Sequence, residues 1–154
     1  MHFVSGRGGG VSEGPWTTLN LGLKAGDNPQ HVIENRRRIA HALDLQSSQL
    51  IFPAQTHSCC VQIVDQDTSV DSLTETDALI TSTLGLCVCV LSADCVPILL
   101  YDPVQRVVGA VHAGWRGTVG QLLTRTVETM RTTFGTQPAH LLAGIGPSIS
   151  PAVY

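Results

Sequence analysis

Three short motifs, well separated in the chain, each carry a side chain that can bind a metal ion. His57 ends the run Gln55-Thr56-His57, Cys95 lies in Ala93-Asp94-Cys95-Val96-Pro97, and His112 opens His112-Ala113-Gly114-Trp115-Arg116-Gly117. Each lies at the end of an apolar run and is followed by a loop. Two imidazoles and one thiolate are one ligand short of a closed tetrahedral zinc site, and a catalytic zinc keeps its fourth position for water or substrate. The sequence therefore indicates an open, three-ligand zinc site.

Taken one by one, these residues also have structural interpretations. A histidine such as His57 at a strand end is more often hydrogen-bonded than metal-bound, and a buried free cysteine such as Cys95 usually serves packing. His112 is the strongest candidate, because Gly114 and Gly117 bracket a bulky Trp-Arg pair and let the backbone bend tightly after it. The spacing of 17 residues between Cys95 and His112 permits one strand-turn-strand excursion. Two adjacent strand ends could then present both groups to one metal ion.

The remaining cysteines give no sign of a disulfide framework. The total is five, an odd number, and Cys59 and Cys60 are adjacent. Reduced thiols in the cytoplasm are the simpler interpretation. Cys87 and Cys89 alternate within an apolar run and are interpreted as packing residues only, whereas the role of Cys59 and Cys60 stays open.

The elements that must position these residues follow from apolar periodicity. Helical spacing predicts helices over 30–43 and 118–134, the second ending at Gly135. Two strands, 50–52 and 61–64, should flank the loop that holds His57. Short apolar runs rich in β-branched residues predict further strands, at 78–81, 87–91, 98–101, 107–111 and 141–145. Residues 4–30 are rich in Gly, Ser, Pro and Asn and are expected to be mostly loop. The mixture predicts an α/β or α+β fold in one domain, 1–154.

Composition narrows the function classes. The chain has 154 residues, of which 43% are hydrophobic and only 14% charged, so much of it must be interior or covered by a partner or by missing sequence. The net charge is −3, and Arg36-Arg37-Arg38 is interpreted as a solvated helix face, so no nucleic-acid partner is expected. The longest apolar stretch, 84–101, contains Asp94 and Pro97, and the N-terminus lacks the apolar core of a signal peptide. No membrane association is therefore expected.

The order of the motifs resembles that of the YfiH-like family, described both as multicopper polyphenol oxidase (laccase domain) and as purine nucleoside phosphorylase. The resemblance covers nearly the whole chain. Besides the three motifs above, it rests on Arg7-Gly8-Gly9-Gly10-Val11-Ser12, Leu19-Asn20-Leu21-Gly22, Gly26-Asp27-Asn28-Pro29, Glu34-Asn35-Arg36, Asp77-Ala78-Leu79-Ile80-Thr81 and Gly144-Ile145-Gly146-Pro147-Ser148-Ile149. The ADC and HAGWRG segments are highly specific for this family.

The resemblance implies a layered α/β sandwich with mixed sheets and a zinc ion on His57, Cys95 and His112. It also implies phosphorolysis of adenosine, inosine and methylthioadenosine, with a purine nucleoside and phosphate as partners, and deamination of adenosine. A zinc ion that activates water suits attack at purine C6. Arg7, in a glycine-rich loop, is the candidate phosphate ligand next to ribose C1′. Asn20 could bind ribose or base, and Asp94 could orient a ligand or transfer a proton.

One departure from the family concerns length, since its members normally continue past the position of Tyr154 with a further α/β portion. We therefore expect the 154-residue form to be a poor phosphorylase with exposed apolar strand surface, which would favour association into oligomers.

Three alternatives remain. A copper oxidase would use the His/Cys set but normally adds an axial Met, and Met1 and Met130 both lie far from the motifs in sequence. A metal-free thiol hydrolase would use Cys95 as nucleophile and His112 as base, with no need of His57. A non-enzymatic remnant completed by a partner chain is the third.

Overall fold

The computed structural model describes residues 2–153, which divide into two compact units. The described residues up to Leu50 form the N-terminal unit, and those from Ile51 onward form the C-terminal unit. Within the described residues, no helix is both long enough and apolar enough to cross a lipid bilayer.

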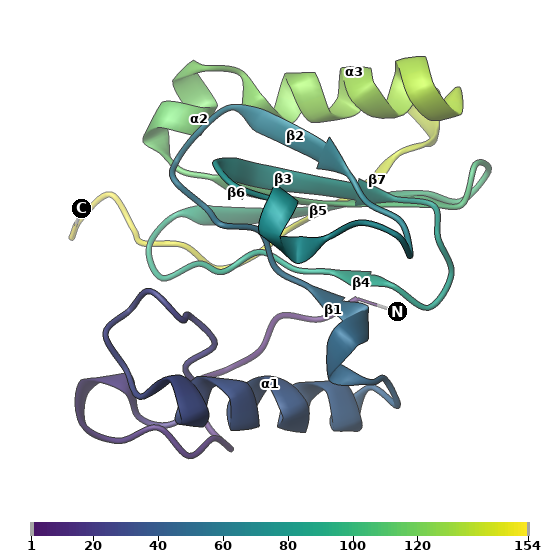
Figure 1. Cartoon of the computed structure of the whole chain (residues 1–154). Coiled ribbons are helices and arrows are strands. Elements are labelled where there is room, and N and C mark those ends of the chain that lie inside the picture. Colours follow the sequence, from purple (N-terminus) through teal and green to yellow (C-terminus); the bar gives the residue numbers. More distant parts are fainter. Residues whose placement is uncertain (1, 154) are drawn as a thin grey trace. The chain divides into compact units, whose positions relative to one another are not determined.

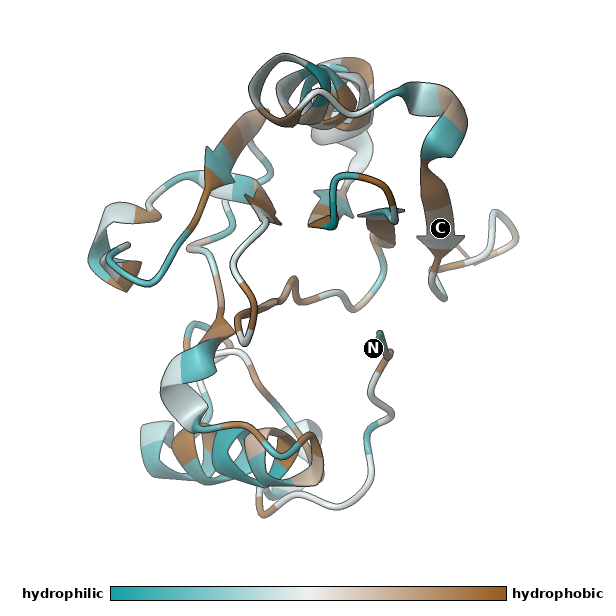
Figure 2. Ribbon diagram, turned by 90° about the vertical axis from the view of Figure 1, so that its right-hand side faces the viewer, coloured by the Kyte–Doolittle hydropathy of each residue, from teal (hydrophilic) through white to brown (hydrophobic). Residues whose placement is uncertain are grey.

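The N-terminal unit is built on one helix, α1 (Pro29–Ala42), which confirms the predicted helix within one residue at each end. The Asn28 side chain caps its start by accepting a hydrogen bond from the Gln30 N–H, and Pro29 has the fixed φ that suits the first helical position. Val32, Ile39 and Ala40 are buried. Hydrophobic and hydrophilic stretches alternate along this helix in Figure 2, as its amphipathic pattern requires. Two short 3-10 helices, η1 (Gly14–Trp16) and η2 (Ser47–Gln49), complete the unit.

Buried polar groups hold the long N-terminal loop against α1. Asn35 is fully buried and accepts from the Val11 N–H at 2.8 Å. Its amide nitrogen donates to Ser12 Oγ, to the Thr18 carbonyl and to the Asn20 carbonyl. Because one side chain satisfies four groups of a loop that has little regular structure, Asn35 fixes the path of that loop.

The C-terminal unit contains a five-stranded mixed sheet in the order β2-β3-β6-β5-β7. Figure 1 labels these strands. They are β2 (Cys60–Ile63), β3 (Thr76–Thr81), β5 (Val96–Asp102), β6 (Val107–Ala113) and β7 (Leu142–Ile145). β2 pairs parallel to β3, and the other neighbours are antiparallel. The helices α2 (Trp115–Val119) and α3 (Leu122–Phe134) lie along one face of the sheet. This mixed architecture confirms the predicted fold class.

The side-chain alternation of the strands gives the two faces of the sheet different roles. The face toward α3 packs a hydrophobic core around Ala78, Ile80, Ile98, Leu100, Val107, Val111, Leu122 and Met130. On the other face, Leu79 packs with Ile51, Val64 and Leu73. Residues 77, 95, 97 and 112 therefore have the strand parity of this second face, away from α3.

Two predicted elements differ from the structure. The strand expected over 87–91 is only β4 (Cys87–Val88), which pairs with β1 (Leu50–Ile51) in a short second sheet. Further along the chain, the backbone of Leu91 is hydrogen-bonded to the Gln55 side chain instead of to a neighbouring strand. The helix expected over 118–134 is divided into α2 and α3, because Gln121 adopts a left-handed φ of 60° that interrupts the helix.

Candidate metal centre

Strand register brings two of the three sequence-predicted ligands to one end of the sheet. Pro97 of β5 is the partner of His112 in β6, and Cys95 directly precedes β5. The predicted pair of adjacent strand ends is therefore present. His57 comes from the loop before β2 and adopts a left-handed φ of 60°.

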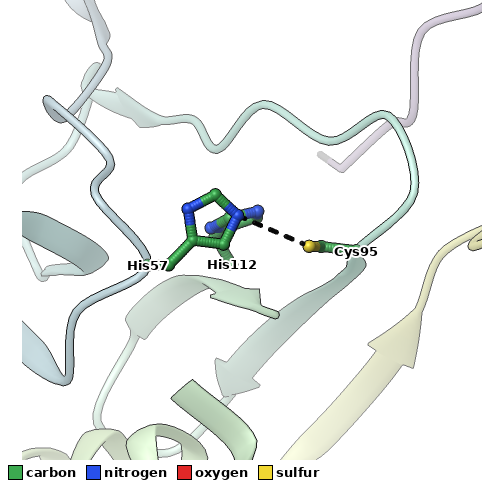
Figure 3. Close-up of side chains that lie close together, drawn as sticks. All are labelled: His57, Cys95 and His112. Atoms are coloured by element: carbon green, nitrogen blue, oxygen red, sulfur yellow. Dashed lines mark hydrogen bonds between the residues drawn. The ribbon is translucent and has the colours of Figure 1, made fainter. Parts of the chain in front are cut away.

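The three donor groups converge on one point, as Figure 3 shows. One ligand atom from each of His57, Cys95 and His112 lies within 4.8 Å of the other two. Cys95 Sγ is 3.8 Å from His57 Nε2, and the two imidazole rings meet edge-on with centroids 4.9 Å apart. His112 is buried, Cys95 is partly buried and His57 is exposed. The set is thus anchored in the sheet on one side and open on the other.

Asp77, the second residue of β3, orients this site. The register pairs Ala78 with Val111, so the preceding residue Asp77 lies opposite His112. Its Oδ1 is 2.8 Å from His112 Nδ1. A carboxylate at this position favours the tautomer with a proton on Nδ1 and leaves the Nε2 lone pair for a metal ion, the arrangement found around protein-bound zinc.

The same carboxylate also fixes the loop that carries His57. Asp77 accepts hydrogen bonds from the backbone N–H groups of Thr56, His57 and Ser58, at 3.1, 3.1 and 2.7 Å. Burial raises the pKa of Asp77, but the hydrogen bonds from His112 and from the loop outweigh it and leave the pKa below its ordinary value. One anionic side chain therefore holds two of the three candidate ligands in place.

Gln55 connects the His57 loop to the chain segment before Cys95. Its side-chain amide donates to the Leu91 carbonyl at 2.8 Å and accepts from the Leu91 N–H at 2.7 Å. This pair of hydrogen bonds replaces strand pairing at Leu91. It also gives the segment from Leu91 to Cys95 a fixed starting point.

Gly114 is required by the close approach of the ligands. A Cβ at this position would lie 2.9 Å from His57 Cδ2 and 3.0 Å from Cys95 Sγ. Its backbone is extended, with φ −72° and ψ 172°, so the reason for glycine is space and not conformation. The chain does turn at Gly114, from β6 into α2, but in a conformation open to any residue, so the requirement for glycine at this position is steric.

The surroundings of Cys95 disfavour its thiolate form unless a cation is bound beside it. Burial raises the pKa of Cys95, and the negative charges of Asp94 and Asp77 raise it further. A bound metal ion would supply the positive charge that stabilises the thiolate. The donor set, its open side and the carboxylate behind His112 all fit a zinc ion of the catalytic type.

The sequence predicts three further site residues, Asp94, Arg7 and Asn20, and the structure shows the exposure or hydrogen bonds of each. Asp94 is exposed, next to Cys95, and its carbonyl accepts from the Ile149 N–H at 3.0 Å. Arg7 is an exposed residue of the N-terminal unit whose guanidinium donates to the Thr17 carbonyl at 3.2 Å. The Asn20 side chain, in the same unit, donates to Asp27 at 3.0 Å and accepts from the Gly22 N–H at 3.0 Å. Asn20 therefore has a clear structural role in its loop.

The role of Asp77 does not follow from the sequence, where this residue is only the first member of a family motif. One signal does point to it. A carboxylate within a fully buried strand requires specific partners, because an unpaired charge in that position is costly.

Fold and site together define a mixed α/β protein with a candidate three-ligand metal centre, and comparison with known proteins is consistent with this class. The chain belongs to the family described as multi-copper polyphenol oxidoreductase laccase, whose family model matches residues 1–154.

Its relatives include proteins named purine nucleoside phosphorylase. One from Deinococcus radiodurans is 42% identical over 153 residues, covering 99% of this chain and 58% of that protein. One from Bacteroides thetaiotaomicron is 38% identical over 160 residues, covering 99% of this chain and 59% of that protein. The chain thus spans somewhat more than half the length of these relatives.

Solved structures show the same fold. The crystal structure of the Bacillus licheniformis hypothetical protein YfiH aligns with a TM-score of 0.90 and 35% identity, covering 96% of this chain and 58% of that one. YlmD from Geobacillus stearothermophilus aligns with a TM-score of 0.89 and 34% identity, covering 96% and 57%.

Proposed function

We propose that this chain carries the metal-binding part of a zinc-dependent purine nucleoside phosphorylase. The observation that carries the proposal is the convergence of His57, Cys95 and His112 behind the orienting carboxylate of Asp77. The names of the relatives supply the reaction class. The proposed substrates are phosphate and adenosine, inosine or methylthioadenosine.

The proposed zinc would be held by His57 Nε2, Cys95 Sγ and His112 Nε2. When bound, it would supply a Lewis acid with one open position for water or substrate. Asp77 would keep both imidazoles in their metal-binding orientation and would keep the proton of His112 on Nδ1. The exposed side of His57 would be the side from which a substrate enters.

Two observations favour zinc over the alternatives. Met130, a residue of α3, is buried in the core between that helix and the sheet, on the sheet face opposite to that of His112, so it does not provide the axial ligand of a blue-copper site. Met1 lies outside the described residues. The raised pKa of Cys95 is the opposite of what a metal-free thiolate nucleophile requires.

The roles outside the metal centre complete the proposal. Arg7 binds phosphate, because an anionic cosubstrate needs a charge-assisted partner and this guanidinium is exposed in a glycine-rich loop. Asn20 binds ribose or base, and Asp94 orients a ligand or transfers a proton beside Cys95. Deamination of adenosine is proposed as a second activity of the same metal centre, through its open position.

Metal content tests the first part of the proposal. Protein prepared without added metal should contain up to about one equivalent of zinc, and Cys95→Ser should lose most of it. Cys60→Ser is the matched control, because Cys60 is an exposed thiol outside the donor set. Equal zinc in both variants, or stoichiometric copper with an intense blue colour, would refute the assignment.

Activity tests the second part. Inosine and phosphate should yield hypoxanthine in a longer chain extended to the length of the relatives, and poorly or not at all in the 154-residue form. Arg7→Ala should weaken phosphate saturation, whereas Arg37→Ala, an exposed arginine of the same unit paired with Glu34, should not. Release of inosine from adenosine tests the deaminase activity. A zinc-loaded longer chain without phosphorolysis would overturn the proposal.

A further inference from the structure

Two cysteines outside the metal centre lie in contact at the end of β4. Cys87 Sγ and Cys89 Sγ are 3.8 Å apart, and both side chains are partly buried. Cys87 lies in β4 and Cys89 directly follows that strand, and the contact between the two sulfur atoms shows that both thiols lie on the same side of the chain. The sequence indicates only packing for this pair.

The backbone around this pair is less constrained than that of a central strand. β4 ends at Val88, and the Cys89 thiol lies 3.4 Å from the Cys87 carbonyl oxygen. The Cys89 N–H donates to the Ile51 carbonyl at 2.9 Å, but Cys89 itself lies beyond the strand. The sulfur atoms must approach by less than 2 Å to reach the length of a disulfide bond, about 2.05 Å.

We propose that Cys87 and Cys89 form a redox modification site, which hydroperoxides convert from a dithiol to a disulfide. This inference is independent of the proposed phosphorylase function.

The chemistry takes two steps. The Cys87 thiolate attacks a peroxide oxygen, so that an S–O bond forms, the O–O bond breaks and hydroxide or alkoxide leaves. The Cys89 sulfur then attacks the sulfenic sulfur of Cys87, the S–S bond forms, and the hydroxyl group leaves with the thiol proton as water. Overall, two thiols are oxidised by two electrons and one hydroperoxide is reduced to an alcohol, or to water, plus one water.

The assignment of Cys87 as the attacking residue follows from its surroundings. The hydrogen bond with the Cys89 thiol lowers the pKa of Cys87 to about 7, against the raising effect of burial. At neutral pH about half of such a thiol is ionised, compared with a few per cent of an ordinary cysteine, so a roughly tenfold faster reaction is expected. Cys89, with its sulfur already in contact, is the resolving residue.

The sequence allows each group of cysteines to be followed separately. Cleavage before aspartate yields the peptide 77–93, which contains Cys87 and Cys89 and no other cysteine. Cys59 and Cys60 fall in 44–64, and Cys95 falls in 94–101. The experiment treats the full chain with hydrogen peroxide at neutral pH, blocks remaining thiols by alkylation, digests and measures the peptide masses over time.

In the peptide 77–93 a disulfide should form, seen as the loss of two hydrogen atoms and of the alkylated form. The rate of this reaction should be about ten times the rate at which the peptide 44–64 is oxidised, and a dithiol reductant should reverse it. In Cys89→Ser the reaction should stop at a sulfenic acid on Cys87 that dimedone traps. In Cys87→Ser the peptide should oxidise no faster than 44–64. Equal oxidation rates for all three peptides, or a disulfide that joins 77–93 to another peptide, would overturn the proposal.

Discussion

Replacement of Asp77 by asparagine is the most direct test of how the metal centre is held. The four groups that approach this carboxylate are all donors, namely the backbone N–H groups of residues 56–58 and His112 Nδ1. Each carboxylate oxygen receives two of them. Asparagine has the same shape but offers one accepting oxygen and one donating NH₂ group, so two of the four donors must face another donor.

The size of the effect follows from this count. A hydrogen bond to a charged group contributes about 1.5–3 kcal/mol, so the loss of two predicts a decrease of about 3–6 kcal/mol in the free energy of unfolding. Because Asp77 is fully buried, water does not readily replace the lost partners. This decrease is a large part of the stability of about 5–15 kcal/mol that is typical of a domain.

Zinc affinity should decrease as well. If the amide NH₂ group of Asp77→Asn faces His112, the imidazole must present its acceptor nitrogen to that NH₂ group and carry its proton on the metal side. If the oxygen faces His112, it keeps the His57 N–H as well, but the Thr56 and Ser58 N–H groups on either side of His57 lose their acceptor. Either orientation disturbs one ligand, so a 10–100-fold lower affinity is expected, as for other groups that orient metal-binding histidines.

Asp102→Asn is the matched control. Asp102 is also a fully buried aspartate, but the Val104 and Gln105 N–H groups both donate to its Oδ1 alone. An amide can retain both bonds through its single oxygen.

Urea unfolding followed by circular dichroism, and zinc competition against a chromogenic chelator, measure the two effects. A change in unfolding free energy of less than about 1 kcal/mol for Asp77→Asn, together with unchanged zinc affinity, would refute the reasoning.

Three further predictions concern neighbouring features. Gly114→Ala should reduce zinc affinity, because the added Cβ would lie within 3.0 Å of both His57 and Cys95, whereas Gly144→Ala, with nothing within 4 Å, should leave the affinity measured by chelator competition unchanged. Asn35→Ala should destabilise the loop of the N-terminal unit by about 2–4 kcal/mol, because it removes four hydrogen bonds of a buried amide. Limited trypsin digestion should then cleave after Arg7 faster than in the wild type, and an unchanged digestion rate would contradict this. Hydrogen bonds from Arg37 and Arg38 lower the pKa of Glu34 to about 2, so the stabilisation by the Glu34 carboxylate is complete above the ordinary carboxyl pKa and is lost as the pH falls from about 4.5 towards 2. The difference in unfolding free energy between the wild type and Glu34→Gln should therefore shrink over that pH interval. A difference that stays constant would exclude the ion pairs as its cause.

Local sequence determined much of the secondary structure and the identity of the candidate ligands. The helix at Pro29–Ala42 follows from a capping Asn, a proline at the first position and apolar residues at helical spacing, all of which act within a few residues. The strands β5 and β6 follow from runs of β-branched residues in the same way. The types of His57, Cys95 and His112, at the ends of apolar runs, are by themselves enough to indicate metal chemistry.

The break between α2 and α3 shows the limit of periodicity as a guide. The apolar stripe continues through residues 118–134, so the sequence predicts one helix. The left-handed conformation of Gln121 interrupts it, and Gly120 beside it lies so close to the Cys59 side chain that a Cβ there would overlap with the sulfur. Contacts between segments far apart in the chain thus prevailed over a local pattern.

Tertiary structure alone decided how the candidate metal centre is held. Asp77 contacts the loop of His57, 20 residues away, and His112, 35 residues away, and only strand register brings these groups together. The steric need for glycine at position 114 likewise exists only once His57 and Cys95 have met there. Side-chain chemistry and periodicity are properties of a short segment, whereas hydrogen-bond partners and free space depend on which distant segments pack side by side.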